Sequence, residues 1–178
     1  MTATRILAQF GLTARIGPIG CNASLPQLVE ALGQPFTGDR VSRKQRWPHW
    51  FGYGSLQLVV CGCRLVTMVI VPAGQGEIEV PDARTNAMVT LPSELTYSQL
   101  TAALDEAGCS WTRGQELPGH CSVETAVDAI RTSFVFTTTE SYDGPALTDP
   151  ELCKVVSHVA HDCPPTAHGR PDDGFGAD

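Results

Sequence analysis

The sequence predicts an α+β fold made of two tandem units, each a helix packed on an antiparallel β-meander. The main observation is a repeat at an offset of 72 residues, in which Ser24-x-x-Gln27-Leu28-x-x-Ala31-Leu32 recurs as Thr96-x-x-Gln99-Leu100-x-x-Ala103-Leu104. Each copy has a hydroxyl residue that suits an N-cap, a glutamine three residues later that can reach back to it, and an apolar helical stripe. Strand-length apolar runs follow each copy, as expected for a helix that covers a small sheet.

The repeat divides the chain of 178 residues into four parts. We expect a first helix-plus-hairpin unit at 1–72, a joint at 73–92, a second helix-plus-strands unit at 93–161, and a disordered tail rich in Pro, Gly and Asp at 162–178.

In the first unit, the pattern indicates a short strand at Leu12–Ile16 and a helix at Leu25–Leu32 that ends at Gly33. Residues Gly38–Gln45 are polar and are expected to form a loop. Residues Trp47–Tyr53 are aromatic but include Pro48, which favours an edge strand or the lead-in to a strand.

The clearest element is a hairpin, Ser55–Cys61 with Arg64–Val71, around the two-residue turn Gly62-Cys63. Glycine in the first turn position suits a type II′ hairpin. This turn predicts that Val60 faces Leu65, Leu58 faces Thr67 and Leu56 faces Val69 on the core side of the sheet, under the helix.

Residues Pro72–Pro92 contain several helix and strand breakers, so Ile78–Val80 is at most a short strand. The second unit opens with a helix at Tyr97–Ala107. The remaining expected elements are a strand or helix at Val123–Val127, a strand at Ser133–Thr138, a turn-rich insertion at Ser141–Pro150, and a strand or short helix at Leu152–Val159.

Composition indicates a globular protein without a membrane span, because the longest apolar run, Leu65–Ala73, is far shorter than the ~20 residues that a bilayer requires. Residues Met1–Phe10 lack the pattern of a secretory signal, which favours a cytoplasmic location. The seven cysteines are odd in number and irregularly spaced, so we expect reduced thiols.

Charge is distributed unevenly along the chain. Residues 1–70 carry seven basic and two acidic groups, net +5, whereas residues 71–178 carry five basic and seventeen acidic groups, net −12. Charge complementarity accelerates association and sets specificity. The acidic second unit, including Glu116, Glu124 and Asp128, is therefore predicted to meet a basic protein surface.

A basic run leads into an aromatic run in the first unit. This composition suits single-stranded nucleic acid, where charges meet phosphates and rings stack on bases, or an acidic protein partner, because Trp, Tyr and Arg are enriched in interface hot spots. The alternative is a solvated loop followed by core aromatics, which the acidic net charge of −7 favours. The residues are Arg40, Arg43, Lys44, Arg46, Trp47, His49, Trp50, Phe51 and Tyr53.

Cysteine and histidine gather near the C-terminus, and a helix there would place His158 and His161 on one face. The spacing matches no standard zinc finger and two prolines interrupt it, so we predict no metal or other cofactor. We likewise read Cys61 and Cys63 as packing residues. The five candidate ligands are Cys153, His158, His161, Cys163 and His168.

Catalytic motifs are missing from the sequence: it has no Gly-x-Ser-x-Gly, no His-Glu-x-x-His and no phosphate-binding glycine loop. We therefore expect a binding protein and not an enzyme; the alternative is a small metal-binding protein or enzyme that uses the C-terminal cysteines and histidines.

Three segments resemble a loose group of actinobacterial proteins, over roughly residues 20–140. They are FGYGSLQLVVCGCRLVTMVIV (51–71), LTYSQLTAALDEAGCSW (95–111) and SFVF (133–136). Some members of this group are regarded as immunity proteins, so the resemblance implies an intracellular inhibitor that neutralises a toxin. Cys61 and Cys63, the His-rich end and the long joint are not features of the group.

Overall fold

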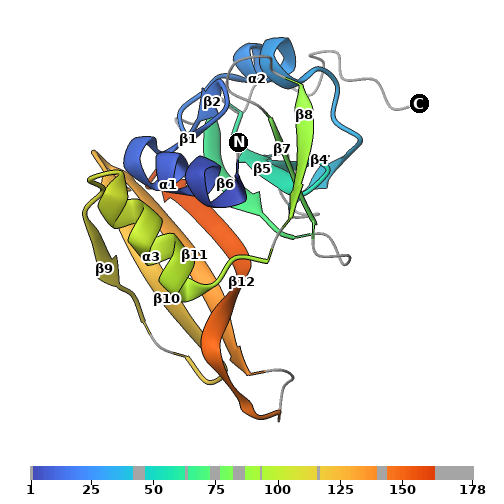
Figure 1. The fold of residues 1–178 in the computed structure, drawn as a ribbon. Helices are drawn as coiled ribbons and strands as arrows, with labels where there is room; N and C mark the ends of the chain where they lie inside the picture. Colours follow the sequence, from blue (N-terminus) through green and yellow to red (C-terminus); the bar gives the residue numbers. More distant parts are fainter. Residues whose placement is uncertain are drawn as a thin grey trace.

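The computed structural model describes residues 2–41, 47–62, 64–72, 77–81, 87–92, 94–115, 117–139 and 144–162. Their fold is α+β, which confirms the predicted class. It has an eight-stranded antiparallel sheet of order β3-β4-β5-β6-β12-β11-β10-β9 and two separate two-stranded sheets, β1-β2 and β7-β8 (Figure 1).

The first part of the chain contributes α1 (Ala3–Thr13), β1 (Arg15–Ile16), β2 (Ile19–Gly20), α2 (Leu25–Leu32), β3 (Thr37–Arg40), β4 (His49–Tyr53), β5 (Leu56–Val60) and β6 (Leu65–Ile70). The second contributes β7 (Glu77–Pro81), β8 (Met88–Pro92), α3 (Tyr97–Glu106), β9 (Trp111–Arg113), β10 (His120–Val127), β11 (Ile130–Thr139) and β12 (Ala146–Val159).

The two repeated segments form helices at the predicted positions. Gln27 Oε1 accepts the backbone N–H of Ser24 at 2.8 Å, and Gln99 Oε1 accepts that of Thr96 at 3.1 Å. Each bond satisfies a donor at the start of a helix, where no backbone acceptor exists. Gly33 ends α2 with φ of 73°, a conformation in which a side chain is strained.

The eight-stranded sheet consists of two runs of neighbouring strands. Strands β3 to β6 lie side by side in chain order, β9 to β12 do the same, and the last strand of each run pairs with the other. At this seam β12 runs antiparallel to β6, with Val155 opposite Ile70 and His158 opposite Thr67. Buried side chains from both runs, such as Leu58 and Phe134, belong to one hydrophobic cluster.

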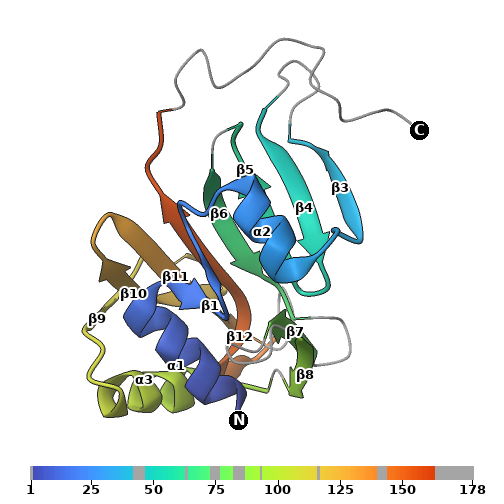
Figure 2. The same cartoon turned by 90° about the horizontal axis from the view of Figure 1, so that it is seen from above.

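The helices cover one face of this sheet. In Figure 1, α1 and α3 lie over β10 to β12, and in Figure 2, α2 lies over β4 and β5. The contact between α1 and the sheet is close: a Cβ on Gly11 would lie 3.4 Å from both Phe134 Cζ and Thr125 Cγ2. At the other end, the Tyr53 hydroxyl donates to the carbonyl of Gly33 at 3.2 Å, which fixes the end of α2 above β4.

Three predictions for the first unit are wrong. A strand was expected at Leu12–Ile16, but most of it belongs to α1, which begins at the N-cap Thr2 and ends at Ala14 in the left-handed region (φ of 52°). The first three residues of the expected loop at Gly38–Gln45 belong to β3, which pairs with β4 and replaces it as the edge strand, and residues 42–46 lie outside the described residues. All four residues of β3 are exposed, so its strand conformation depends on pairing with β4 and not on an apolar pattern in the sequence.

The predicted hairpin is confirmed, with one correction to its register. The Cys61 N–H donates to the carbonyl of Arg64 at 3.0 Å, and Val60 faces Leu65 as expected. A bulge between Val59 and Val60 then shifts the pairing by one residue, so that Leu58 faces Met68 and Leu56 faces Ile70. The bulge keeps the large apolar side chains of both strands on the core face.

The predicted joint is more structured than expected. Strands β7 and β8 form a hairpin inside it, with Ile78 and Val80 fully buried in the core. Of the alternatives left open for the second unit, the strand is correct for both β10 and β12. The last strand begins at Ala146, inside the segment expected to be an insertion. Residues 140–143 and the expected tail from 163 onward lie outside the described residues.

Within the described part of the chain, no helix has the length and apolar character needed to cross a membrane.

Candidate functional site

The candidate site is the face of the eight-stranded sheet that the helices do not cover, here called the open face. Side chains alternate along each strand, and the set opposite the core keeps at least part of its exposure. No described helix or strand lies over it (Figures 1 and 2). It comprises Trp50, Gln57, Val59, Thr67, Val69, Glu124, Arg131, Ser133, Val135, Lys154, Val156 and His158.

The pairing registers place these side chains in rows across the strands. One row runs from Trp50 through Val59, Thr67 and His158 to Arg131. The next runs from Gln57 through Val69, Val156 and Ser133 to Glu124. Because both rows cross the seam between β6 and β12, the open face is one continuous surface built by both halves of the chain.

Trp50 is held flat against the open face. Its Nε1 donates to Gln57 Oε1 at 3.2 Å. Its ring lies over Gly52, where a Cβ would stand 3.2 Å from Trp50 Cη2 and 2.6 Å from Thr37 Oγ1. A large ring in a fixed position loses little entropy when a partner packs on it.

The charges on the open face differ in sign from those of the second unit as a whole. Arg131 on β11 and Lys154 on β12 are exposed, whereas Glu124 is the acidic side chain of this set and is half-buried. The acidic excess lies elsewhere in the described residues, for example at Asp105 and Glu106 on α3. The centre of the open face is therefore apolar, with a rim that favours negatively charged partners.

The structure separates the predicted basic and aromatic residues. Trp50 lies on the open face, whereas Trp47 packs against the hydrophobic core with Phe51. The rings thus do not form one stacking platform, because alternate residues of β4 point to opposite faces. Arg40 is exposed on the edge strand β3. Arg43, Lys44 and Arg46 lie outside the described residues.

The predicted acidic residues are also separated. Glu124 lies on the open face, and Asp128 is exposed in the turn between β10 and β11, with φ of 53°. Glu116 lies outside the described residues.

The condition for placing His158 and His161 on one helical face is not met, because His158 belongs to strand β12. His158 is on the open face, while His161 Nδ1 accepts the Arg64 Nε–H at 3.0 Å. The Cys153 thiol donates to the carbonyl of Val135 at 3.3 Å, and burial raises its pKa. Among the described residues, no three such side chains meet as a metal site would require. Cys163 and His168 lie outside them.

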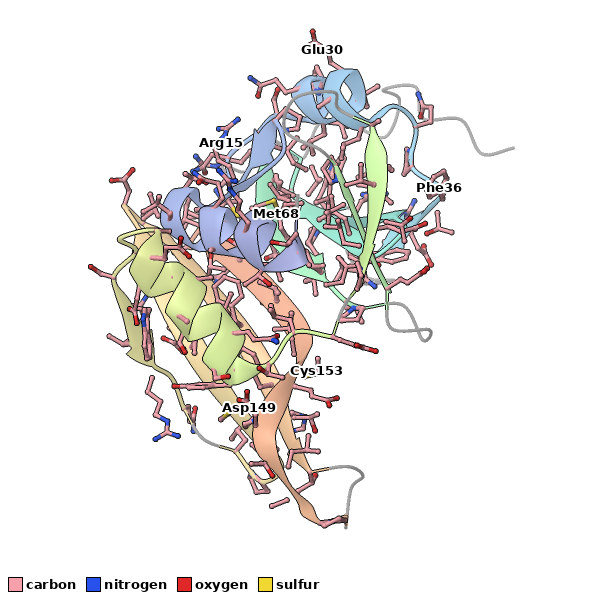
Figure 3. All side chains as sticks on the ribbon, in the orientation of Figure 1. Arg15, Glu30, Phe36, Met68, Asp149 and Cys153 are labelled. Atoms are coloured by element: carbon pink, nitrogen blue, oxygen red, sulfur yellow. The ribbon has the colours of Figure 1, made fainter. Side chains whose placement is uncertain are left out.

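A cavity of about 460 Å³ lies between the β1-β2 turn and α2. The Cys21 thiol forms part of its wall and contacts Ser157 Oγ at 3.9 Å. Burial raises the pKa of Cys21, so the thiol stays protonated and is a poor nucleophile. On the rim, Glu30 points from α2 into solvent, away from Arg15 (Figure 3), so the two charges do not converge on one point.

The expectation of reduced thiols is wrong for Cys61, which is disulfide-bonded. Cys21, Cys109, Cys121 and Cys153 form no disulfide.

Sequence reasoning missed most of the open face because its pattern is that of an ordinary amphipathic sheet. Val69, Val156 and Arg131 carry no motif. The available signal was alternation along Leu56–Val60 and Ser133–Phe136, which identifies two faces but not which strands lie side by side.

No protein-family model matches the chain, and neither the curated proteins nor the solved structures contain a significant match.

Proposed function

We propose that this chain is a non-enzymatic protein-binding module and that the open face is its binding surface. The observation that carries this proposal is the uncovered side of an eight-stranded sheet whose other side carries the hydrophobic core. Antiparallel sheets commonly face water on one side, but that side is then usually polar. Here Val59, Val69, Val135 and Val156 occupy it beside a fixed tryptophan.

The size of the open face suits one partner's share of a stable interface. Eight strands at ~4.8 Å spacing span roughly 34 Å. Central strands of five or six residues are roughly 17–20 Å long. The product is roughly 600–700 Å², close to the ~800 Å² that each partner contributes to a standard interface.

The composition also suits an interface. Binding surfaces have an apolar centre within a polar rim, and their energetic hot spots are enriched in Trp and Arg. The valines of the open face lie between Trp50 at one end and Arg131 at the other. A matching partner carries apolar side chains flanked by carboxylates.

Within this class, we propose the inhibitor role that the resemblance to immunity proteins implies, with a toxin as the partner. The charge of the open face changes the expected mode of binding: contact through it uses Arg131 and Lys154, not the acidic residues of the second unit. We also propose that the two helix-plus-meander halves are tandem copies of one unit. The matched capping residues of α2 and α3 support this, as does the equivalent strand order on each side of the seam.

A cytoplasmic location is part of the inhibitor proposal, and the disulfide at Cys61 weighs against it. Disulfides persist in oxidising compartments and are rare in the cytosol. Binding through the open face does not depend on the compartment.

Site-specific photocrosslinking in the native cell tests the proposal. A photoreactive side chain at Val69, in the centre of the open face, is expected to form a covalent adduct with a partner protein. The same group at Arg5, exposed on α1 on the opposite side, serves as the matched control. Adducts of equal yield at both positions, or none at Val69, contradict the proposal.

Affinity for the crosslinked partner provides the quantitative test. Trp50→Ala is expected to weaken binding by roughly 30-fold, as for a hot-spot residue. Arg131→Glu is expected to weaken binding more at low salt than at high salt. Arg5→Glu is expected to leave the affinity unchanged. Equal affinities for Trp50→Ala and the native chain refute the assignment of the open face.

A further inference from the structure

The two edges of the eight-stranded sheet, β3 and β9, differ in how their outward backbone groups are satisfied. At the β3 edge, the Val41 N–H donates to the carbonyl of Pro48 at 3.0 Å. Because bonded and non-bonded pairs alternate in an antiparallel ladder, Arg40 directs its backbone groups outward. Its N–H donates to the Asp39 carboxylate at 2.6 Å. A charged side chain thus covers part of this edge, a common protection against strand pairing.

The β9 edge carries no such cover on Trp111. The Gly114 N–H donates to the carbonyl of Ser122 at 2.9 Å. By the same alternation, Thr112 and its register partner Glu124 exchange backbone hydrogen bonds. The backbone N–H and C=O of Trp111 therefore point away from β10, and neither has a hydrogen-bond partner among the residues that the structure describes.

A hollow lies on each side of the sheet beside this edge, and β9 forms the outer margin of the sheet in Figure 1. The first hollow, of about 490 Å³, lies at the end of α3 on the helix-covered side. The second, of about 390 Å³, lies on the open face. The first is lined by Asp105, Gly108, Cys109, Ser110 and Trp111, and the second by Ser110, Trp111, Thr112, Glu124, Thr125, Ala126 and Arg131. A strand added to β9 would send alternate side chains into the two hollows.

The hollow beside α3 is negatively charged. Asp105 Oδ1 accepts the Trp111 Nε1–H at 2.8 Å, which holds the carboxylate at the edge. Within the described part of the chain, its second oxygen makes no further bond. Glu106 is exposed next to it at the C-terminal end of α3, where the helix dipole adds partial negative charge. This hollow therefore favours a lysine or arginine side chain.

The hollow on the open face presents a positive charge. Arg131 is exposed opposite Ala126. Glu124 is turned away from it, because Glu124 Oε1 lies 2.8 Å from the position of a Cβ on Gly114, on the other side of Glu124 from Arg131. Ser110 and Ala126 are small, so a long side chain can cross them from the edge toward the guanidinium. This hollow therefore favours a carboxylate.

We propose that the β9 edge binds an extended segment of a partner protein by strand addition, with a basic residue opposite Trp111 and an acidic residue next to it. Neighbouring residues of a strand point to opposite sides of the sheet, so this pair places one charge in each hollow. Backbone hydrogen bonds to Trp111 supply affinity, and the hollows supply specificity. The strand Trp111–Arg113 of a second copy contains no carboxylate for Arg131. The site adjoins the open face through Arg131 but does not require the contact proposed there.

A synthetic peptide, Thr-Val-Thr-Lys-Glu-Val-Thr with blocked ends, tests strand addition by fluorescence anisotropy. Binding is expected below about 1 mM. Methylation of the lysine backbone nitrogen removes a donor that faces Trp111 and is expected to weaken binding roughly tenfold. Methylation of the glutamate nitrogen, which points away from β9, is the matched control and should leave the affinity unchanged. Equal affinities for the two methylated peptides, or no binding of the parent peptide, overturn the proposal.

Variants of the full chain test the two hollows. Asp105→Asn keeps an acceptor for the Trp111 indole but loses the charge, and Arg131→Gln loses the guanidinium. Each is expected to weaken peptide binding roughly threefold at low salt. Asp128→Asn is the control, because Asp128 lies in the β10-β11 turn outside both hollows. Trp50→Ala should also leave peptide binding unchanged, which separates this site from the proposed contact on the open face. Full affinity in both Asp105→Asn and Arg131→Gln refutes the role of the hollows.

Amide hydrogen exchange locates the added strand. Saturating peptide is expected to slow exchange of the Trp111 amide roughly tenfold and to leave that of Thr112, already bonded to Glu124, unchanged. An unprotected Trp111 amide in the complex overturns strand addition. Sedimentation equilibrium tests a second copy as the occupant, and a dimer that the peptide does not dissociate also overturns the proposal.

Discussion

Two threonines that face each other across β10 and β11 are predicted to respond in opposite ways to the same substitution. Thr125 and Thr132 are register partners, and both are buried. Thr132 Oγ1 donates to Ser157 Oγ at 3.0 Å, and Ser157 in turn contacts the Cys21 thiol. Thr125 Oγ1 has no hydrogen-bond partner among the described residues.

Replacing each with valine keeps the shape and removes one hydroxyl. Thr132→Val takes the hydrogen-bond donor from a fully buried serine, which is expected to cost about 1–2 kcal/mol. Thr125→Val removes a polar group that lost its hydration without gaining a partner, so the variant is expected to be about 1 kcal/mol more stable. For a chain of this size, each kcal/mol shifts the Tm by roughly 2–4 °C.

Urea and thermal unfolding followed by circular dichroism measure both effects. Thr67→Val on the open face is the control, since Thr67 is half-buried on the uncovered side and reports the strand propensity of valine alone. Equal changes in the free energy of unfolding for Thr125→Val and Thr132→Val refute the reasoning, because the hydrogen bond would then make no difference.

Three further substitutions test other contacts. Gly52→Ala is expected to displace the Trp50 ring and Thr37, because Trp50 Cη2 and Thr37 Oγ1 would lie 3.2 and 2.6 Å from the new Cβ. The hydrogen bond from Trp50 to Gln57 is then expected to break. A tryptophan fluorescence spectrum that matches that of the native chain contradicts this. Leu104→Ala, in the core beside Gly11, is expected to cost about 2–5 kcal/mol in chemical unfolding, and a loss below 1 kcal/mol would mean that α3 is not packed as described. Asp149→Asn is expected to destabilise the start of α3, because hydrogen bonds from Ser98 and Thr96 lower the pKa of Asp149. A carboxyl with a lower pKa in the folded state adds stability above its unfolded pKa of ~3.9 and loses it as pH falls through the folded value. The difference in the free energy of unfolding between the native chain and Asp149→Asn should therefore be constant near neutral pH and shrink below about pH 4. A difference that does not depend on pH excludes this account.

Local patterns in the sequence predict local structure well in this protein. The boundaries of α2 follow from Ser24, Gln27 and Gly33, because capping depends on residues within one turn of each other. The β5-β6 hairpin follows in the same way from the glycine between its two apolar runs in the sequence. The shift in its register does not, since the bulge at Val59 and Val60 is set by packing against distant strands.

Long-range pairing was not predictable from one sequence. The edge strand β3 consists of four exposed residues, and only pairing with β4 distinguishes it from a loop. The seam between β6 and β12 joins residues almost ninety positions apart, so no local pattern reveals the open face. The duplicated pattern suggested two small sheets, whereas β3 to β6 and β9 to β12 form one.

The seam also sets the order in which the protein can be completed during synthesis. After β6 emerges from the ribosome, its free edge waits for Val155–His158 of β12, the segment that will pair with it. At 5–20 residues per second, the intervening residues 71–154 take roughly 4–17 s to translate. During that interval the edge of the apolar strand Leu65–Ile70 that will later pair with β12 stays unpaired. Variants that delay the pairing of β12 with β6 are therefore expected to aggregate more during synthesis, because unpaired strand edges promote aggregation.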